Sequence, residues 1–293
     1  MLKKFRASAI GSRADIKAGV DISKVNGGYF SSPKNNKSLL KIGVAAIEKK
    51  LPKIVKYADF GGGQGLLARP VVDFLKTKAH TVRGVVVDGN ENYLAEAKKK
   101  GLAVALCNLE SCPISNLDLL TMRAVIHYNT PPKQRKILRN VFSSLKVGGY
   151  FVHQVSSGSV ANCTLRAAIV NLPELGRGGA GKYHWTSVDE ALQLHEDAGF
   201  SDTYIAGYAP SASWGPEEQW ERFNKKLIDD ATREQNQKKL QKILHRREKY
   251  FTAANAVIKK FLKKYGAKET GIEQKSNGNF TIHYPYPIII SRK

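Results

Sequence analysis

The stretch YADFGGGQG, residues 57–65, decides the fold of this 293-residue chain. It follows a short apolar run at residues 54–60 that predicts a buried strand, and it precedes an amphipathic run at residues 67–76 that predicts a helix. Glycines at such a turn allow positive φ and let a ligand approach the backbone closely. The N–H groups at the start of the next helix can also face an anionic or polar ligand. The turn therefore predicts either a ligand site or simply a tight corner between a strand and a helix.

The spacing of the glycines separates two kinds of ligand-binding turn. Counted from Gly61, the third glycine of the dinucleotide pattern G-x-G-x-x-G falls on Leu66, so a hydride-transfer enzyme is the second-best interpretation. The pattern Asp-x-Gly-x-Gly-x-Gly, which starts at Asp59, is complete. An acidic residue, Asp88, also ends the next predicted strand, where it can accept hydrogen bonds from ribose hydroxyls. Asp59 itself can attract a cationic ammonium group.

Two patterns alternate along residues 54–158. Short apolar, β-branched runs such as residues 83–88 predict strands that are buried on both faces, and the amphipathic runs between them predict helices. This alternation is typical of right-handed β-α-β crossovers and of a parallel sheet covered by helices on both faces. We therefore expect an α/β fold: a doubly wound, mostly parallel seven-stranded sheet of the Rossmann-like type with helical cap insertions.

The elements of this fold can be placed along the chain. Strands are predicted at residues 54–60, 83–88, 102–106, 117–122, 150–155, 201–208 and 280–291. Helices are predicted at residues 38–49, 67–76, 92–100, 131–145, 160–171, 187–198, 216–227 and 233–265. Pro285 and Pro287 indicate that the last strand is an edge strand or is bulged. Gly266 is predicted to cap the last helix at its C-terminus.

The chain is predicted to form a single domain with three parts. Residues 1–53 form an N-terminal arm and a helix, and residues 54–158 form the ligand-binding core. Residues 159–293 add helical cap elements and the strands that complete the sheet. Because the last predicted strand returns after a long helical excursion, one core with an insertion is simpler than two independent domains.

The net charge of the chain is strongly positive, with 47 Lys and Arg against 25 Asp and Glu, or +22. The surplus is concentrated outside the predicted core. Residues 1–58 hold 13 basic and 3 acidic side chains, and residues 214–293 hold 18 and 9. Lysines of the last predicted helix lie largely off its apolar stripe. This distribution favours a solvated lysine-rich surface over a nucleic-acid or membrane surface.

The composition also indicates the cellular compartment in which we expect the protein. No apolar run approaches the ~18 residues that span a bilayer, and no apolar stretch or cleavage site follows the basic N-terminus. The three cysteines, Cys107, Cys112 and Cys163, cannot all pair and form no Cys-x-x-Cys. We therefore expect a cytoplasmic protein with no membrane span and no metal site.

The motifs along the core resemble those of the class I S-adenosylmethionine-dependent methyltransferases. The resemblance is continuous over about residues 54–158, and it implies the Rossmann-like methyltransferase fold. The matching segments are DFGGGQG at 59–65, VVD at 86–88, NL at 108–109, LTMRAVIHY at 120–128 and LKVGGYFV at 145–152.

The resemblance implies S-adenosyl-L-methionine as the cofactor and assigns it eight residues. These are Asp59 for the methionine amino group, Gly61, Gly63 and Gly65 for the bend beneath the cofactor, Asp88 for the ribose hydroxyls, Asn108 and Leu109 for the adenine edge, and Arg123, through its backbone carbonyl, for the methionine portion. Family members often carry Asp where Asn108 stands.

Methyl transfer needs an aligned nucleophile, and a general base only where the acceptor loses a proton. His127, after the fourth predicted strand, is the candidate base, since its ordinary pKa near ~6.5 suits proton removal at neutral pH. The alternative is a histidine that lines the pocket wall or packs on the sheet. Tyr128 is the second candidate, either orienting the acceptor or packing. His153 lies within a strand and is predicted to be structural.

Three further residues are candidates for substrate binding. Tyr183 and His184 follow a glycine-rich connection at residues 176–181, which predicts either a closing flap or a surface turn anchored by Trp185. Tyr29 precedes the first predicted helix, where it could cover the pocket or anchor that helix.

Three functions are compatible with the sequence. The first is methyl transfer to a small-molecule acceptor through an O-, N- or C-nucleophile. The second is an RNA or DNA methyltransferase that uses the basic surface, although the run NTPP at residues 129–132 lacks the aromatic residue of the base-methylating motif. The third is a non-catalytic binding protein that keeps the cofactor fold. The sequence does not indicate the oligomeric state.

Overall fold

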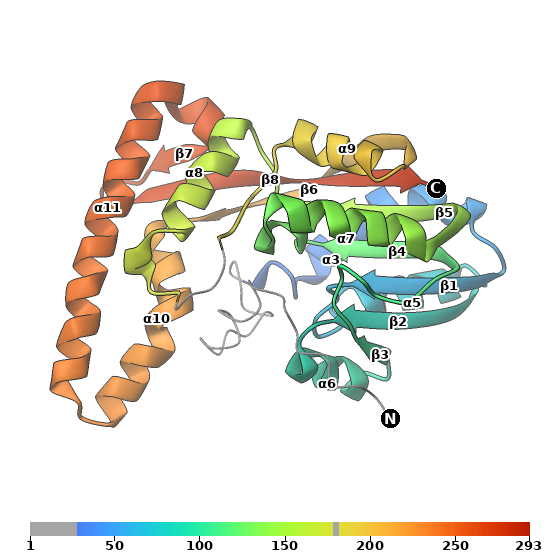
Figure 1. Cartoon of the computed structure of the whole chain (residues 1–293), viewed down its shortest axis with the longest axis horizontal. Helices are drawn as coiled ribbons and strands as arrows, with labels where there is room; N and C mark the ends of the chain where they lie inside the picture. Colours follow the sequence, from blue (N-terminus) through green and yellow to red (C-terminus); the bar gives the residue numbers. More distant parts are fainter. Residues whose placement is uncertain (1–27, 178–181) are drawn as a thin grey trace.

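The computed structural model describes residues 28–177 and 182–293, which form an eight-stranded sheet with helices on both faces (Figure 1). The predicted arm before residue 28 and most of the glycine-rich connection lie outside the described residues. The strand order is β3-β2-β1-β4-β5-β8-β6, and β7 pairs with β8 off this path. All pairings among β1 to β5 are parallel, whereas β8 is antiparallel to both β5 and β6. The predicted doubly wound, mostly parallel sheet is therefore confirmed, with β7 as an additional short strand.

The strands agree closely with their predicted positions, with two exceptions. The strand predicted at residues 150–155 begins at Leu145, because Leu145 already pairs with Leu117 before a register shift. The strand predicted at residues 201–208 continues to Trp214, which pairs with Ile282. The bounds are β1 Ile54–Phe60, β2 Thr81–Asp88, β3 Ala103–Leu106, β4 Leu117–Arg123, β5 Leu145–Gln154, β6 Ser201–Trp214, β7 Ile272–Gln274 and β8 Phe280–Arg292.

The helices also follow the prediction, although the first one starts earlier, at Pro33, where proline suits the first turn. The N-terminal run passes through a π-helical segment and ends in a 3₁₀ turn. The bounds are α3 Pro33–Leu39, η1 Leu40–Val44, α4 Ala45–Ile47, η2 Glu48–Lys50, α5 Ala68–Thr77, α6 Glu91–Lys99, η3 Ile126–Tyr128, α7 Pro131–Ser144, α8 Val160–Val170, η4 Pro173–Leu175, α9 Val188–Asp197, α10 Pro216–Arg233 and α11 Gln237–Thr270.

Two predictions about backbone breakers need correction. Gly266 does interrupt the helix where predicted, since its backbone is non-helical (φ 76°, ψ 170°), but a second helical segment follows the kink and α11 continues to Thr270. The helix ends at Gly271, which adopts the left-handed conformation (φ 69°) and leaves only 2.2 Å between an added Cβ and the carbonyl oxygen of His283. The prolines of β8 do not mark an edge, because β8 lies between β5 and β6. They coincide with a register shift opposite Pro285, so the bulged alternative holds.

Each face of the sheet buries its own apolar cluster. Neighbouring residues of a strand point to opposite faces, so Leu119 packs into one cluster and Leu120 into the other. Helices α7 and α9 cover the face that carries Leu120, whereas α3, α5 and the cap helices belong to the cluster of Leu119. Because of this two-sided burial, six of the seven residues of β4 are buried, including the polar Asp118 and Thr121.

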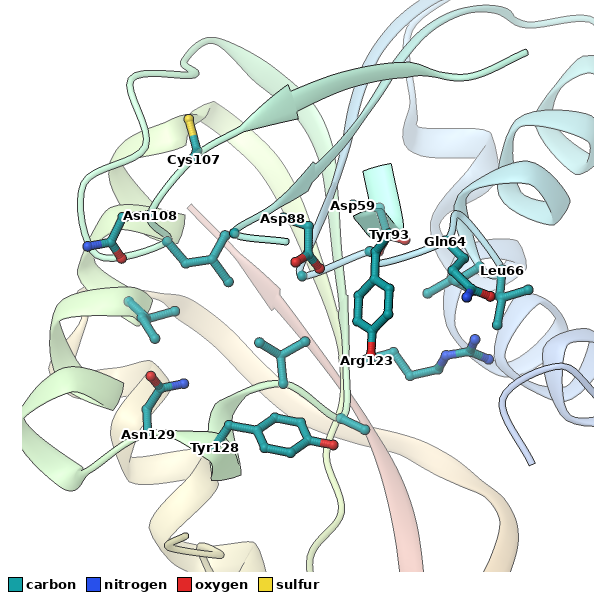
Figure 2. A pocket seen from close by; sticks show the side chains of 18 of the residues that line it. Asp59, Gln64, Leu66, Asp88, Tyr93, Cys107, Asn108, Arg123, Tyr128 and Asn129 are labelled. Atoms are coloured by element: carbon teal, nitrogen blue, oxygen red, sulfur yellow. The ribbon is translucent and has the colours of Figure 1, made fainter. Parts of the chain in front are cut away.

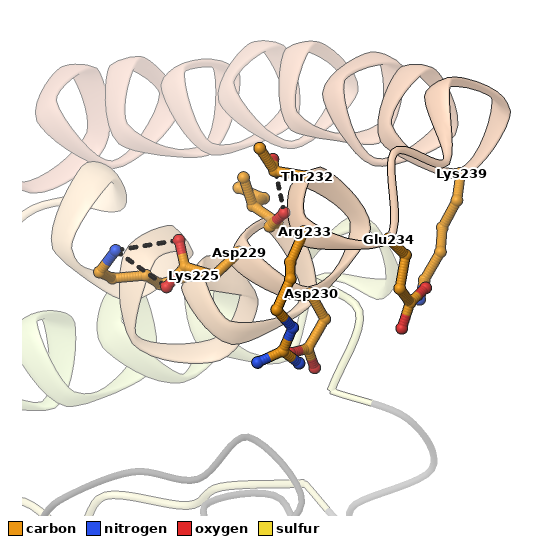
Figure 3. A network of polar contacts seen from close by, with 8 residues as sticks. Lys225, Asp229, Asp230, Thr232, Arg233, Glu234 and Lys239 are labelled. Carbon is orange, nitrogen blue, oxygen red and sulfur yellow. Dashed lines mark hydrogen bonds and ion pairs between the residues drawn. The ribbon is translucent and has the colours of Figure 1, made fainter.

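Helices α8, α10 and α11 form a cap at one end of the sheet (Figure 1). Within α10 and at its turn into α11, surface ion pairs join Lys225 to Asp229, Arg233 to Asp230 and Lys239 to Glu234 (Figure 3). Exposed pairs of this kind contribute little to stability. None of the helices within the described ranges is both long and apolar enough to cross a membrane.

A buried pair of histidines joins three elements of the sheet's second face. His153 in β5 and His195 in α9 lie 2.9 Å apart through Nδ1 and Nε2, and His195 Nδ1 lies 2.7 Å from the Ser291 hydroxyl in β8. The prediction that His153 is a structural, hydrogen-bonded residue agrees with this arrangement. Burial lowers the pKa of His195 to about 3 and that of His153 well below its ordinary value. Both rings are therefore neutral in the folded protein at physiological pH.

We expect His195→Asn to reduce the free energy of unfolding at pH 7 by ~1–3 kcal/mol, since His153 and Ser291 lose a buried partner. Because His195 is protonated near ~pH 6.5 only in the unfolded chain, the wild type loses stability on acidification below that pH. The difference in the free energy of unfolding between the wild type and His195→Asn should therefore shrink by up to ~1.4 kcal/mol per pH unit below pH 6.5. Urea unfolding at pH 7, 6 and 5 measures it.

His245→Asn is the matched control, because His245 is exposed on α11. It should leave the free energy of unfolding nearly unchanged at all three pH values. A stability difference for His195→Asn that stays constant between pH 7 and pH 5 contradicts the assignment of a neutral buried imidazole.

Candidate functional site

The carboxyl ends of β1, β2 and β4 meet where the strand order reverses, between β1 and β4. In open α/β sheets, ligands bind in the crevice at this switch point. The loops that follow these strands surround an open pocket of about 120 Å³, here named the main pocket (Figure 2). Its lining consists of Phe30, Asp59, Gly61, Gly62, Gln64, Leu66, Leu67, Asp88, Gly89, Tyr93, Cys107, Asn108, Leu109, Glu110, Arg123, Ala124, Val125, Tyr128, Asn129 and Ile137.

The glycine turn after β1 can be built only from glycine at its key positions. Gly61, Gly63 and Gly65 all have positive φ, between 52° and 72°. An added Cβ on Gly61 would lie 2.4 Å from a methyl group of Val125, and one on Gly65 would lie 2.4 Å from a methyl group of Leu102. Gly61 lines the main pocket, whereas the other two glycines shape the turn without lining it.

Asp59, the penultimate residue of β1, is a buried carboxylate in the wall of the main pocket. The hydroxyl of Thr121 in β4 donates a 2.7 Å hydrogen bond to its Oδ1. Among the described residues, no hydrogen-bond partner reaches its Oδ2. Burial raises the pKa of Asp59 to about 7, against the opposing effects of Thr121 and the Arg123 charge. A ligand with a cationic donor would satisfy the second oxygen and stabilise the ionised form.

Asp88 ends β2 and fixes the glycine turn against that strand. Its Oδ2 accepts a 2.9 Å hydrogen bond from the Gly63 N–H, and its Oδ1 accepts one of 2.8 Å from the Asn90 N–H. The N–H of Gly61 donates to the Val87 carbonyl at 2.7 Å, just before Asp88. Burial raises the pKa of Asp88 to about 6. The carboxylate lines the main pocket and, with about four lone-pair sites, can accept further hydrogen bonds.

Arg123 contributes its side chain to the main pocket, in addition to the backbone carbonyl that the sequence suggested (Figure 2). Its guanidinium donates to the Asn36 side-chain oxygen and, at 3.0 Å, to the Phe30 carbonyl, and it lies 5.3 Å from the centre of the Phe30 ring. Burial lowers the pKa of Arg123, while Asp59 counteracts that effect. The main pocket therefore holds one buried cationic and one buried anionic side chain in electrostatic contact.

The far side of the main pocket follows β3. Asn108 and Leu109 both line it, as their predicted role requires. The Asn108 side-chain oxygen accepts a 3.0 Å hydrogen bond from the Glu110 N–H, and Asn140 donates to the Leu109 carbonyl at 3.1 Å. These contacts hold the loop in position.

Several lining residues were missed by the sequence interpretation. The Tyr93 side chain extends into the pocket between Asp88 and Arg123 (Figure 2). Tyr93 belongs to α6, whose N-terminus is capped by the Asn90 side chain. A capped helix directly after an acidic strand end is a signal that could have indicated Tyr93. The other missed residues with large side chains include Phe30, Gln64 and Asn129.

A second, smaller cavity adjoins the main pocket. It has a volume of about 20 Å³, which is little more than the space of one water molecule, and is here named the aromatic chamber. Phe30 and Tyr128 line both cavities, so they form the wall between them. The chamber is lined by Phe30, His127, Tyr128, Ser156, Tyr183, Trp185, Trp214, Gln219, Arg222, Tyr284 and Tyr286.

His127 lies in the aromatic chamber rather than in the main pocket. Its ring stacks on Trp185 at 5.1 Å and 12° and packs on Tyr128 at 4.2 Å. No described residue makes a hydrogen bond to its Nδ1. Burial and the charges of Arg166 and Arg222 lower the pKa of His127 well below its ordinary value. The imidazole is therefore neutral and can accept a proton or a hydrogen bond.

The segment that contains Tyr183 and His184 is anchored by Trp185, as one of the two predicted alternatives expects, but it does not lie on the surface. Tyr183 and Trp185 are buried and line the aromatic chamber. His184 lines neither cavity; its N–H donates to the His127 carbonyl at 3.0 Å, and its carbonyl accepts from the Gln134 side chain at 2.8 Å. These backbone contacts fix the segment against η3.

Tyr29 also lies outside both cavities. Its hydroxyl donates to the Pro210 carbonyl at 2.7 Å and accepts from Gln154 at 3.1 Å, and its ring stacks on Tyr286 at 4.4 Å. The anchoring alternative fits this position, and the neighbouring Phe30 is the residue that reaches the pockets. Within the described part of the chain, no cluster of three or more His, Cys, Asp or Glu side chains is arranged to hold a metal ion.

Comparison with known proteins adds evidence on the fold. No family model matches the sequence, and no curated protein matches it. Among solved structures, the YcgJ protein of Bacillus subtilis superposes with a TM-score of 0.59 at 16% identity, covering 86% of this chain and 97% of that protein. A protein of Bacillus halodurans C-125 named as a candidate methyltransferase superposes with a TM-score of 0.59 at 16% identity, covering 88% of this chain and 99% of that one. With the strand order and the switch-point pocket described above, the chain has the class I methyltransferase fold.

Proposed function

We propose that the protein is an S-adenosylmethionine-dependent methyltransferase that acts on a small molecule. The observation that carries the proposal is the charge pattern of the main pocket. Asp59 and Arg123 both line the main pocket and offer opposite charges, which suits the ammonium and carboxylate groups of a methionine moiety. Asp88 offers acceptor sites at the end of the next strand, which suits ribose hydroxyls. Asp59 Oδ2 has no hydrogen bond of ordinary geometry among the described residues, although the Ala68 N–H lies near the carboxylate, so a donor of the ligand can bind there.

S-Adenosylmethionine supplies a methyl group on a sulfonium, which passes to a nucleophile by in-line displacement. The chain's own residues must then orient the acceptor, exclude water and, where needed, remove a proton. Tyr128 lies at the boundary of the two cavities, and the neutral His127 lies beside it in the aromatic chamber. We infer that an acceptor binds at the Tyr128 end of the main pocket, that Tyr128 orients it, and that the neighbouring His127 takes its proton.

A nucleic-acid acceptor is less well supported. A base would have to be flipped into the main pocket, which is lined by side chains from many segments. The exposed lysines of α11, such as Lys260 and Lys264, lie on the cap at the far end of the sheet from β1 and β2 (Figure 1). These lysines of α11 are therefore not among the residues that line the main pocket.

Asp88→Ala should weaken the binding of S-adenosylhomocysteine by about 10- to 100-fold, because charge-assisted hydrogen bonds to the ribose are lost. Titration calorimetry at pH 7.5 measures the dissociation constant. The control is Asp229→Ala, which removes an exposed carboxylate of α10 and should bind like the wild type. Absence of binding to the wild type, or equal affinity of Asp88→Ala, contradicts the assigned site.

Binding of S-adenosylmethionine should strengthen about five- to tenfold between pH 6 and pH 7.5. With a pKa of about 7, Asp59 is mostly protonated at pH 6 and cannot pair with an ammonium, whereas it is mostly ionised at pH 7.5. Asp59→Asn should bind more weakly and lose most of this pH dependence. A small residual dependence is expected from Asp88, whose pKa is about 6. Identical pH profiles for the two proteins would exclude the proposed ammonium contact.

Incubation with S-adenosylmethionine and a metabolite library should yield S-adenosylhomocysteine with at least one acceptor. With that acceptor, His127→Asn should lower kcat about 100-fold or more, because a general base is lost. Its affinity for S-adenosylmethionine should not change, since His127 does not line the main pocket. Cofactor binding without turnover on any metabolite or bulk RNA supports a non-catalytic binding protein instead.

A further inference from the structure

Three buried polar side chains lie in a row behind the main pocket and are here named the hydroxyl chain. Tyr57 and Asp59 point to the same face of β1, and Thr121 is the partner of Asp59 in the neighbouring strand β4. The hydroxyl oxygens of Tyr57 and Thr121 lie 2.7 Å apart, and the Thr121 hydroxyl donates to Asp59 Oδ1 at 2.7 Å. Of the three buried residues, only Asp59 lines the main pocket.

The sheet makes room for the Tyr57 ring. Gly84 of β2 pairs with Tyr57, and it interrupts a strand that is otherwise rich in valine. A Cβ on Gly84 would lie 3.2 Å from a carbon of the Tyr57 ring and 3.1 Å from a methyl group of Val72. Glycine inside a strand often marks such a close approach. The place of the Tyr57 ring is therefore set by β2 on one side, and that of its hydroxyl by Thr121 on the other.

The Tyr57 hydroxyl is a permanent hydrogen-bond donor. Among the described residues, Thr121 is its only hydrogen-bond partner. Burial and the charge of Asp59 raise the pKa of Tyr57 well above its ordinary value, against the opposing effects of Thr121 and Arg123. The phenol therefore keeps its proton throughout the physiological pH range.

Only an ionised Asp59 gives every proton of the hydroxyl chain an acceptor. In that state Asp59 only accepts, so Thr121 donates to Asp59 and Tyr57 donates to Thr121. A proton on Oδ1 would reverse both hydrogen bonds and leave the Tyr57 proton with no acceptor among the described residues. A proton on Oδ2 would itself have no acceptor there. Because an unmade hydrogen bond at a buried group costs free energy, the hydroxyl chain favours the carboxylate.

Other groups around Asp59 act on its charge as well. Burial is the largest effect and raises the pKa of Asp59 to about 7. The Thr121 hydroxyl, the Arg123 charge and the Ala68 N–H lower that pKa, whereas the charge of Asp88 raises it. The hydrogen bond from Thr121 is the largest of the effects that oppose burial. A change at the far end of the hydroxyl chain should therefore be felt at the carboxylate.

We propose that Tyr57 is a positioning residue for the cofactor: through Thr121 it holds Asp59 in the ionised form that receives the ammonium group of the methionine moiety. This inference rests on the proposed function, because it concerns the contact between Asp59 and S-adenosylmethionine. Tyr57 does not line the main pocket, so it acts through Thr121 and not by contact with the ligand. Its hydroxyl sets the pH above which the site accepts the cofactor.

Tyr57→Phe removes the hydroxyl and keeps the ring, so Asp59 should be harder to ionise. We expect the midpoint of Asp59 ionisation to move upward from about pH 7 by about 0.5–1 pH unit. Thr121→Val removes the direct donor and should move the midpoint further, whereas Thr121→Ser keeps a hydroxyl and should stay near the wild type. NMR titration of ¹³C-labelled aspartate side chains in the full chain without ligand measures the midpoint, and Asp59→Asn identifies the signal.

Ligand binding gives a second readout, which separates the loss of ionisation from a loss of packing. By calorimetry at pH 6.5, Tyr57→Phe should bind S-adenosylhomocysteine about three- to eightfold more weakly than the wild type, because less of its Asp59 is ionised. At pH 8.5 the two proteins should bind almost equally well. Comparison at equal pH cancels the titration of the ligand's own amino group. Damage to packing would weaken binding at both pH values.

Tyr250→Phe is the matched control. Tyr250 is a buried tyrosine of α11 that does not line the main pocket, and its hydroxyl has no hydrogen-bond partner among the described residues. The control should match the wild type in both measurements. An Asp59 midpoint in Tyr57→Phe equal to that of the control, or equal binding at pH 6.5, overturns the inference. If S-adenosylhomocysteine does not bind to the wild type, the proposed function fails, while the NMR titration still tests the hydroxyl chain.

Discussion

The hydrogen bonds between the glycine turn and the end of β2 are the constraint on which the site depends. The Asp88 carboxylate and the Val87 carbonyl accept N–H groups of the turn, so β1, β2 and the start of α5 are fixed relative to one another. This arrangement leaves Asp59 at the pocket wall, where Thr121 of β4 satisfies only one of its oxygens. Burial removes water from both carboxylates and so raises their pKa values. A ligand that donates hydrogen bonds to the carboxylates offsets the free-energy cost of this desolvation.

Much of the core could be predicted because its signals are local. Strands that are buried on both faces of a parallel sheet are recognisable as mainly apolar runs. The turn after β1 needs positive φ at Gly61, Gly63 and Gly65, so glycine recurs at every second position after Asp59. These two rules place the main pocket and the residues at the strand ends. The outer boundaries were less well predicted, because the length of β6 is set by its pairing with β8, which lies some 70 positions later in the sequence.

The residues that line the two cavities could not be predicted in the same way. The aromatic chamber is assembled from residues as distant as Phe30, Ser156, Arg222 and Tyr284, and no sequence pattern connects them. The side chain of Arg123 reaches the main pocket because Asn36 and Phe30, from the first helical segment, accept its hydrogen bonds. His127 was found from its position after β4, but its neutral state depends on tertiary burial and on two arginines from the cap.

The wall formed by Phe30 and Tyr128 has a thermodynamic consequence for the two cavities. Any ligand that presses against these rings from one side alters the surface offered to a ligand on the other side. Occupancy of the two cavities is therefore linked, and the factor by which the first ligand changes the affinity of the second applies equally in the reverse direction. Such a link would need only the two shared side chains to change position, without any movement of the sheet.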